Sequence, residues 1–128
     1  MRLAEAFFDA SIWAAHGRFD RAAFAEFLEN LSASPSGLLI VTPDGFLAGV
    51  AYAMPFDPGL VIADEIYWYS EAPGKGGELR AQFEAWAQTM GASVIQMSCQ
   101  TDEREPALRR LVARAGFEPV STVFRRVA

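Results

Sequence analysis

The sequence predicts a single α+β domain, and three observations favour this class. Apolar residues alternate along the 128-residue chain between helical spacing and strand-like runs. Between residues 60 and 99, a strand, a glycine-rich segment, a helix and a second strand follow one another. This is the order of a β-α-β unit, whose strands are parallel with a right-handed crossover. No internal repeat, linker or low-complexity segment interrupts the chain, so we expect residues 1–128 to form one domain.

Two helices and a β-hairpin are predicted in the first part of the chain. Asp20 stands where the N-cap of the second helix belongs, and Pro43-Asp44-Gly45 has the chemistry of a tight turn. Pro55 and Pro58 mark the loop after the hairpin. The expected helices cover residues 3–15 and 21–31, and the expected strands cover residues 38–42 and 46–54.

The strongest strand signal covers residues 60–69, which are rich in β-branched and aromatic side chains. Strict alternation places three side chains on each face of this strand. One face is expected to carry Glu65, Tyr67 and Tyr69, and the other Asp64, Ile66 and Trp68.

The glycine-rich run from Pro73 to Gly77 is the first candidate binding site. Glycines at a strand-to-helix junction allow backbone N–H groups to converge on a phosphate at the positive end of a helix. The run completes neither a Walker A loop nor the dinucleotide-binding fingerprint, and such runs are often only turns. Lys75, the only lysine of the chain, lies inside it.

The last third of the chain predicts a helix, a strand and a further helix with an extended end. The first helix runs from about Leu79 to Met90, and a strand follows over residues 93–99. Asp102 and Glu105 have capping-box spacing. The final helix, with Pro106 in its first turn and Gly116 as its C-cap, is followed by one or two extended segments over residues 117–127.

Composition and charge narrow the class of protein. Hydrophobic residues make up 52% of the chain, and the single Cys99 and single His16 exclude a disulfide framework and Cys/His zinc sites. We therefore expect a cytoplasmic protein without a metal. The net charge of −5 argues against nucleic-acid binding, and no apolar run approaches the roughly 20 residues that span a bilayer.

The charge is unevenly distributed along the chain. Residues 1–103 carry a net charge of −9, whereas residues 104–128 carry a net charge of +4. The basic part could attract a small anionic ligand, although a charge run of this kind more often forms a solvated helix face. The acidic part favours a cationic ligand, through long-range steering only.

From about Asp20 to Val127 the chain resembles the GNAT superfamily of acyl-CoA-dependent N-acyltransferases, especially the small members found in phage-related genes. The resemblance rests on the order and spacing of four stretches around the β-α-β unit. These are residues 44–50 (DGFLAGV), 65–69 (EIYWY), 83–87 (FEAWA) with Gly91-Ala92, and 108–120 ending in GFEPV. It implies a central mixed sheet flanked by about four helices, in which the parallel strands 60–70 and 93–99 splay apart.

The resemblance also implies a site. Acetyl-CoA would bind as co-substrate between the splayed strands, and a primary amine would attack its thioester directly. The implied cofactor-binding residues are Tyr69, Ser70 and Glu71 for the pantetheine arm, and Gly74, Lys75, Gly76 and Gly77 for the pyrophosphate.

Glu65 is the predicted catalytic base, because members of this family often carry a glutamate on this strand. Alternatively, Glu65 is a solvated or hydrogen-bonded strand residue beside Asp64 without a catalytic role. A backbone N–H near Tyr69 or Ser70 is expected to stabilise the oxyanion. Ser98 and Cys99 would end the second strand close to the acyl group.

Two departures from the family pattern keep other functions open. The pyrophosphate loop is shortened and opens on Ala72 or Pro73 instead of Arg or Gln. Val112 stands where the family often has the tyrosine that protonates the thiolate. The alternatives are a non-catalytic GNAT-fold binding or assembly protein and a CoA-binding sensor. The apolar residues among 120–127 could also pair with the sheet edge of a second copy in a homodimer.

Overall fold

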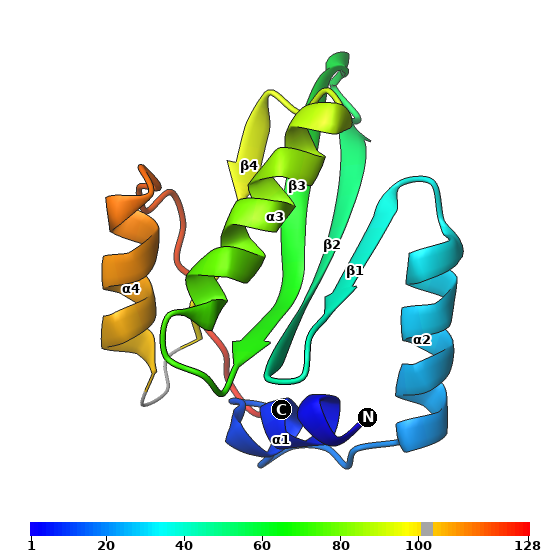
Figure 1. Ribbon diagram of the computed structural model, residues 1–128, viewed down its shortest axis with the longest axis vertical. Coiled ribbons are helices and arrows are strands. Elements are labelled where there is room, and N and C mark those ends of the chain that lie inside the picture. The colour runs from blue at the N-terminus through cyan, green and yellow to red at the C-terminus, as the bar shows by residue number, and fades with distance from the viewer. Residues whose placement is uncertain (101–103) are drawn as a thin grey trace.

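The computed structural model describes residues 1–100 and 104–128 of the chain. It contains a four-stranded mixed sheet with helices on both faces (Figure 1). The strands lie in the order β1-β2-β3-β4, with the first two pairs antiparallel and β3-β4 parallel. The α+β class, the hairpin and the β-α-β unit are therefore confirmed. The elements are α1 (Arg2–Ala10), α2 (Arg21–Ala33), β1 (Gly37–Val41), β2 (Gly45–Met54), β3 (Asp57–Ser70), α3 (Lys75–Thr89), β4 (Val94–Gln96) and α4 (Glu105–Arg114).

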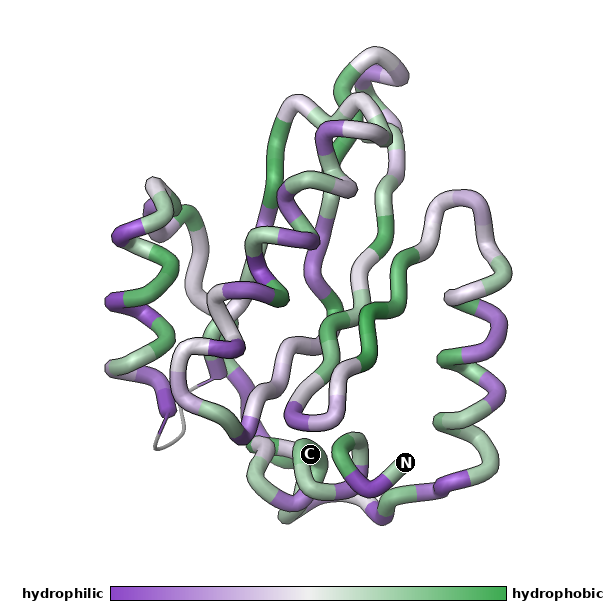
Figure 2. The backbone as a smooth tube through the Cα atoms, in the orientation of Figure 1, coloured by the Kyte–Doolittle hydropathy of each residue, from purple (hydrophilic) through white to green (hydrophobic). Residues whose placement is uncertain are grey.

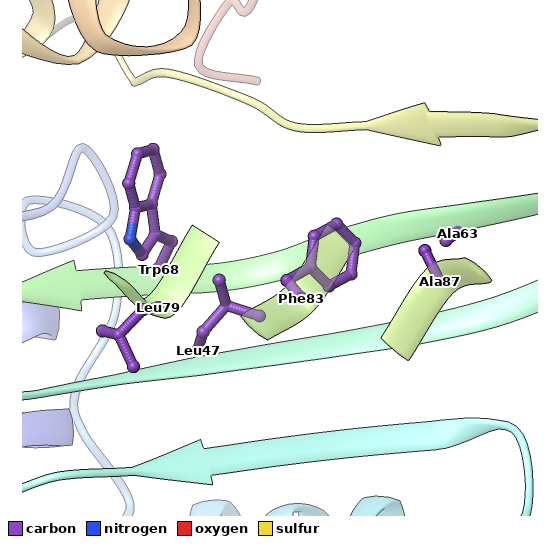
Figure 3. Close-up of a cluster of buried hydrophobic side chains, with 6 residues drawn as sticks. All are labelled: Leu47, Ala63, Trp68, Leu79, Phe83 and Ala87. Atoms are coloured by element: carbon purple, nitrogen blue, oxygen red, sulfur yellow. The ribbon is translucent and has the colours of Figure 1, made fainter. Parts of the chain in front are cut away.

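The helix α3 covers one face of the sheet and supplies most of the main core. Phe83, Leu47 and Leu79 are the largest fully buried side chains, and they come from α3 and from β2 beneath it (Figure 3). Hydrophobic and hydrophilic residues alternate along α3, as expected for an amphipathic helix on a sheet (Figure 2). Leu111 of α4 packs against the edge of the same core.

An aromatic cluster joins α1 and α2 to the face of the sheet opposite α3. The ring of Phe7 meets those of Phe46, Tyr67 and Tyr69 edge to face, at centroid distances of 5.8, 5.5 and 5.9 Å. Phe24 of α2 contacts Tyr67 in the same way at 5.4 Å. Aromatic pairs with this geometry each add about 1 kcal/mol beyond the area that they bury. The cluster therefore fixes α1 across the lower end of the sheet, as Figure 1 shows.

A β-bulge interrupts β3 next to Glu65. The register with β2 shifts between Ala48 and Gly49, and Ile66 has no partner in it. A bulge inserts one extra residue and breaks the two-residue alternation of side chains. Ala63 and Trp68 consequently share the core beneath α3, although strict alternation would separate them. The prediction that Asp64 and Trp68 share a face is therefore wrong, whereas Tyr67 and Tyr69 do share one.

Several predicted boundaries differ from the structure for local reasons. The first helix ends at Ala10 because the hydroxyl and the amide of Ser11 both hydrogen-bond to the Phe8 carbonyl. Asp20 is the N-cap of α2 as predicted, since its Oδ1 accepts from the Ala23 amide at 2.9 Å. The loop predicted over residues 55–59 is shorter, because β3 already begins at Asp57.

The end of the chain departs furthest from the sequence prediction. The strand expected over residues 93–99 is only three residues long, and it forms an edge of the sheet rather than a central strand. Residues 117–128 belong to no strand. Arg104 occupies the N-cap position of α4, and Asp102 of the predicted capping box lies outside the described residues. Gly116 follows the C-cap residue with φ 92°, as a helix-ending glycine does.

Candidate active site

The two parallel strands separate immediately after three residue pairs. β3 pairs with β4 only through Ile62, Ala63 and Asp64, and then continues to Ser70. Beyond Gln96 the chain leaves the strand, and the Ser98 amide hydrogen-bonds to the side chain of Glu65 instead of to the β3 backbone. The expected divergence of the two strands is therefore present, and it begins at Glu65.

A small cavity of about 20 Å³ lies at this divergence. Its polar lining comes from Glu65, Ser98, Gln100 and Arg104, and its apolar lining includes Phe7 and Leu108 of α1 and α4. A volume of this size is enough for one water molecule. Ser98 therefore lines this cavity, and its place beside the acyl group stays a prediction.

Glu65 is the only charged residue that is buried within the described chain, with 7% of its surface exposed. Burial raises the pKa of this carboxyl to about 8, the amide of Ser98 lowers it in part, and the charge of Asp64 raises it further. Desolvation dominates because a carboxylate loses its hydration in this setting. A group with this pKa exchanges its proton near neutral pH, which suits a general acid or base.

Arg104 reaches the same cavity from the start of α4, and sequence reasoning missed it. Its guanidinium carbon lies 5.2 Å from the ring centre of Tyr69 and 5.9 Å from that of Phe7. These cation–π contacts hold the guanidinium over the aromatic cluster. The sequence carries no signal for this contact, because Phe7 and Arg104 are 97 positions apart.

The first turn of α3 contains most of the predicted pyrophosphate loop. Gly74 is the N-cap with φ 78°, a left-handed conformation that favours glycine, and no side chain caps the helix. Lys75, Gly76 and Gly77 are helical rather than loop residues, which corrects the prediction. Their amides lie where an α-helix leaves N–H groups without an intrahelical acceptor. The Lys75 ammonium is 3.3 Å from Glu78 Oε1.

The end of β3 lies beside this helix terminus. The Trp68 indole donates to the Gly76 carbonyl at 3.1 Å, and the Ser70 hydroxyl donates to the Ala72 carbonyl at 3.1 Å. Glu71 forms an ion pair with Arg2 at 2.9 Å. The structure therefore brings the predicted residues 69–71 and 74–77 together at one end of the sheet.

Glu65 lies further along the same strand. It stands five positions before Ser70, which corresponds to roughly 16 Å at the rise of a β-strand. Beyond Asp64, no strand pairs with the β4 side of β3 within the described residues. The backbone between Glu65 and Ser70 therefore offers N–H and C=O groups to an extended ligand.

Comparison with known proteins shows the fold. No protein-family model and no curated protein matches the chain. A transcriptional regulator from Bacillus halodurans has a TM-score of 0.73 at 16% identity, covering 99% of this chain and 91% of its own. An aminoglycoside acetyltransferase from an uncultured soil metagenomic sample has a TM-score of 0.70 at 16% identity, with 99% and 88% covered.

A plant enzyme, glucosamine-6-phosphate N-acetyltransferase from Arabidopsis thaliana, is similar with a TM-score of 0.63 at 11% identity. The match covers 97% of this chain and 90% of that enzyme. At these identities the likeness concerns the fold and not the reaction. No helix in the described ranges is long and apolar enough to cross a membrane. The chain has the α+β, GNAT-like fold of the acetyltransferases, with a mixed sheet whose two parallel strands diverge.

Proposed function

We propose that the protein is an acetyl-CoA-dependent N-acetyltransferase that acts on a primary amine by direct attack. The observation that carries this proposal is Glu65, a buried carboxyl with a pKa of about 8 at the point where β3 and β4 diverge. A carboxyl is costly to remove from water, so carboxyls are seldom buried this deeply in a strand. A buried carboxyl that titrates near neutral pH beside a cavity therefore favours a chemical role.

Glu65 is the general base in this proposal. An amine must lose a proton as it forms the amide bond, and the ionised carboxylate of Glu65 accepts it. The Ser98 amide holds the carboxylate in place and favours its ionised form. Both residues line the same small cavity, so the carboxylate faces the space in which an amine would react.

The residues at the lower end of β3 and at the start of α3 fit acetyl-CoA. The uncapped N-terminus of α3 favours an anionic group, and Gly76 and Gly77 allow a phosphate to approach the backbone closely. Tyr69 and Ser70 would hold the extended arm through their backbone. When bound, acetyl-CoA supplies the acetyl group as a thioester.

Two measurements test this proposal. Isothermal titration with acetyl-CoA, with dephospho-acetyl-CoA as the control, measures binding, and release of free thiol in the presence of amines measures transfer. We expect micromolar binding and amine-dependent thiol release. Glu65→Gln should retain binding and lose transfer, whereas Glu29→Gln, on the exposed side of α2, should retain both. The absence of acetyl-CoA binding up to millimolar concentration would overturn the proposal.

A second candidate is a non-catalytic binding or assembly protein with the same fold. Val112 favours it, because this side chain packs against the core and supplies no proton for a leaving thiolate. The exposed apolar residues of the C-terminal segment also favour a protein partner, such as a second copy. This candidate predicts a stable protein that acetyl-CoA does not stabilise against thermal unfolding.

A further inference from the structure

The backbone of Ile12, two residues after the end of α1, is held by side chains from two distant segments. Its N–H donates to Gln100 Oε1 at 3.2 Å, and its C=O accepts from the Arg125 guanidinium at 2.9 Å. The same guanidinium lies over the ring of Trp13, 5.1 Å from the ring centre. We call the contacts of Gln100 and Arg125 with the Ile12 backbone the Ile12 clip.

Gln100 connects the Ile12 clip to the cavity at Glu65. Its side chain is half-buried, accepts the hydrogen bond from Ile12 and lines the cavity together with Glu65. Because a backbone N–H can only donate, the Ile12 amide fixes the carbonyl oxygen of Gln100 on the side of α1. One side chain therefore joins the wall of the cavity to the end of α1.

The position of α1 controls how far Glu65 is shielded from water. Phe7, five positions before Ile12, lines the same cavity and is itself buried. The cavity has a volume of about 20 Å³, which is enough for one water molecule, and Glu65 is buried beside it. A displacement of the end of α1 away from the cavity would admit further water to the carboxyl.

Two ion pairs also hold α1 within the described part of the chain, but neither lies at this end of the helix. Arg2 pairs with Glu71, and Glu5 pairs with Arg21. The side chains of both pairs are largely exposed, and exposed ion pairs contribute little to stability. The aromatic cluster holds the middle of α1, so its C-terminal end depends on the Ile12 clip.

The polar groups that face Glu65 do not belong to the Ile12 backbone or to Arg125. Asp64 is its neighbour on β3, the Ser98 amide donates to it, and Arg104 lines the cavity from the start of α4. Tyr67 lines the cavity as a phenol whose pKa burial raises, and α1 contributes an uncharged ring. Burial is the largest cause of the raised pKa of Glu65, so its titration reports how much water reaches the carboxyl.

We propose that Gln100 is a positioning residue that holds the end of α1 at the wall of the cavity and thereby keeps water from Glu65. Arg125 holds the same turn from the carbonyl side of Ile12. Gln100 acts through the position of α1 and needs no contact with a substrate. Only the kinetic consequence rests on the proposed function, in which Glu65 is the base.

Ile12→Pro breaks the clip without changing a side chain that lines the cavity. Proline has no backbone N–H, so Gln100 loses its donor. Ser11 has an extended backbone, with φ −87° and ψ 165°, which suits a residue before proline. An NMR titration of the side-chain carboxyl carbons, assigned with Glu65→Gln, measures the midpoint of Glu65 without turnover. We expect Ile12→Pro to lower this midpoint by about one pH unit, because added water reduces the desolvation.

Arg125→Met breaks the clip from the other side, and Arg126→Met is its matched control. Each change removes one positive charge from an exposed position of the C-terminal segment. Loss of a positive charge by itself raises the pKa of a carboxyl. We expect Arg125→Met to lower the midpoint of Glu65 and Arg126→Met not to lower it. The sign of the change therefore separates loss of the clip from loss of the charge.

The outcomes distinguish this inference from the proposed function. Circular dichroism confirms that each variant is folded, and Arg125→Met decides the matter if Ile12→Pro does not fold. An unchanged or raised midpoint in the folded variant overturns the positioning role, even if the protein transfers acetyl groups. A lowered midpoint supports it, even if no transfer is found and the proposed function fails. Where transfer occurs, the limb of kcat/KM that Glu65 contributes should move to lower pH by the same amount.

Discussion

Glu65 is buried at the point where β3 and β4 diverge, and the Ser98 amide offsets only part of the cost of burying its charge. The protonation of this carboxyl governs the proposed activity. Its pKa of about 8 means that the carboxyl is mostly neutral at neutral pH. A base must be ionised, so the titration of Glu65 should add a tenfold rise in kcat/KM per pH unit below about 8 to the titration of the amine itself, and should add nothing above it. A pH profile of thiol release measures this. The Glu65→Gln profile should lack this limb and follow only the titration of the amine, and an unchanged profile would exclude Glu65 from the mechanism.

The same residue also predicts how stability depends on pH. The pKa of Glu65 is raised from 4.5 to about 8 on folding, so the folded state binds more protons between these values. Its contribution to the free energy of unfolding is fully present below pH 4.5 and is lost as the pH rises through about 8. Glu65→Gln should therefore be more stable than the wild type at pH 9, by on the order of a few kcal/mol. Chemical denaturation at both pH extremes checks this, and a stability gain confined to acid pH would contradict it.

At the scale of elements, the packing of α3 against β2 depends on a close contact between Gly49 and the ring of Phe83. A Cβ at Gly49 would lie 2.7 Å from Cε2 of Phe83, which is fully buried. Gly49→Ala should thus destabilise the protein by about 1–3 kcal/mol, as overpacking does. Gly17→Ala is the matched control, since a Cβ there meets nothing within 4 Å. Denaturant unfolding measures both, and combining Gly49→Ala with Phe83→Leu should recover part of the loss if the clash is the cause.

The glycines in the first turn of α3 predict two effects of opposite sign. A Cβ at Gly76 or Gly77 would make only ordinary contacts, at 3.6 and 3.8 Å. Alanine favours a helix over glycine by up to about 1 kcal/mol, so Gly76→Ala and Gly77→Ala should raise the melting temperature. Both should weaken acetyl-CoA binding, because the added methyl group keeps the phosphate from the backbone amides.

Thermal unfolding and isothermal titration, carried out on the same samples, test this pair of effects. Gln82→Ala, on the exposed side of α3, is the control for helix propensity alone and should leave acetyl-CoA affinity unchanged. If the Gly76 and Gly77 variants are more stable and bind acetyl-CoA as tightly as the wild type, the pyrophosphate does not bind at this helix terminus.

At the scale of the whole molecule, the C-terminal segment, residues 117–128, exposes large apolar side chains to solvent. Val123 and Phe124 are each 90% exposed, although they belong to a run suited to a strand. Arg125 anchors the segment to the N-terminal region by donating to the Ile12 carbonyl at 2.9 Å and by lying over the Trp13 ring. Exposed apolar residues of this kind favour association with a second copy.

We therefore predict a homodimer that depends on this segment. Sedimentation velocity over a range of concentrations should show association of the wild type, and Val123→Ser with Phe124→Ser should shift the equilibrium to the monomer. The unfolding midpoint of the monomer should not change, because both side chains are exposed. Phe56→Ser, a change at a residue that is 76% exposed in the β2-β3 turn, should leave association intact. A wild type that stays monomeric throughout would contradict the prediction.

The sequence by itself determined the elements whose signals are local. Asp20 caps α2 through its own side chain, and Gly91 and Gly116 follow their helices with positive φ, because such features depend on a few neighbouring residues. The hairpin and the β-α-β order follow from apolar periodicity and turn chemistry, which are also local. The resemblance of four stretches was enough to predict the fold and to single out Glu65.

Only the tertiary structure decided how the candidate site is assembled. The bulge at Ile66 depends on pairing with β2, and it reversed the expected alternation around Glu65. The stacking of Arg104 on Tyr69 and the link from Tyr52 to Asp64 join residues that are distant in sequence. The burial that raises the pKa of Glu65 comes from several elements packed together. Desolvation and cross-strand contacts are properties of the packed chain, so no local pattern of residues encodes them.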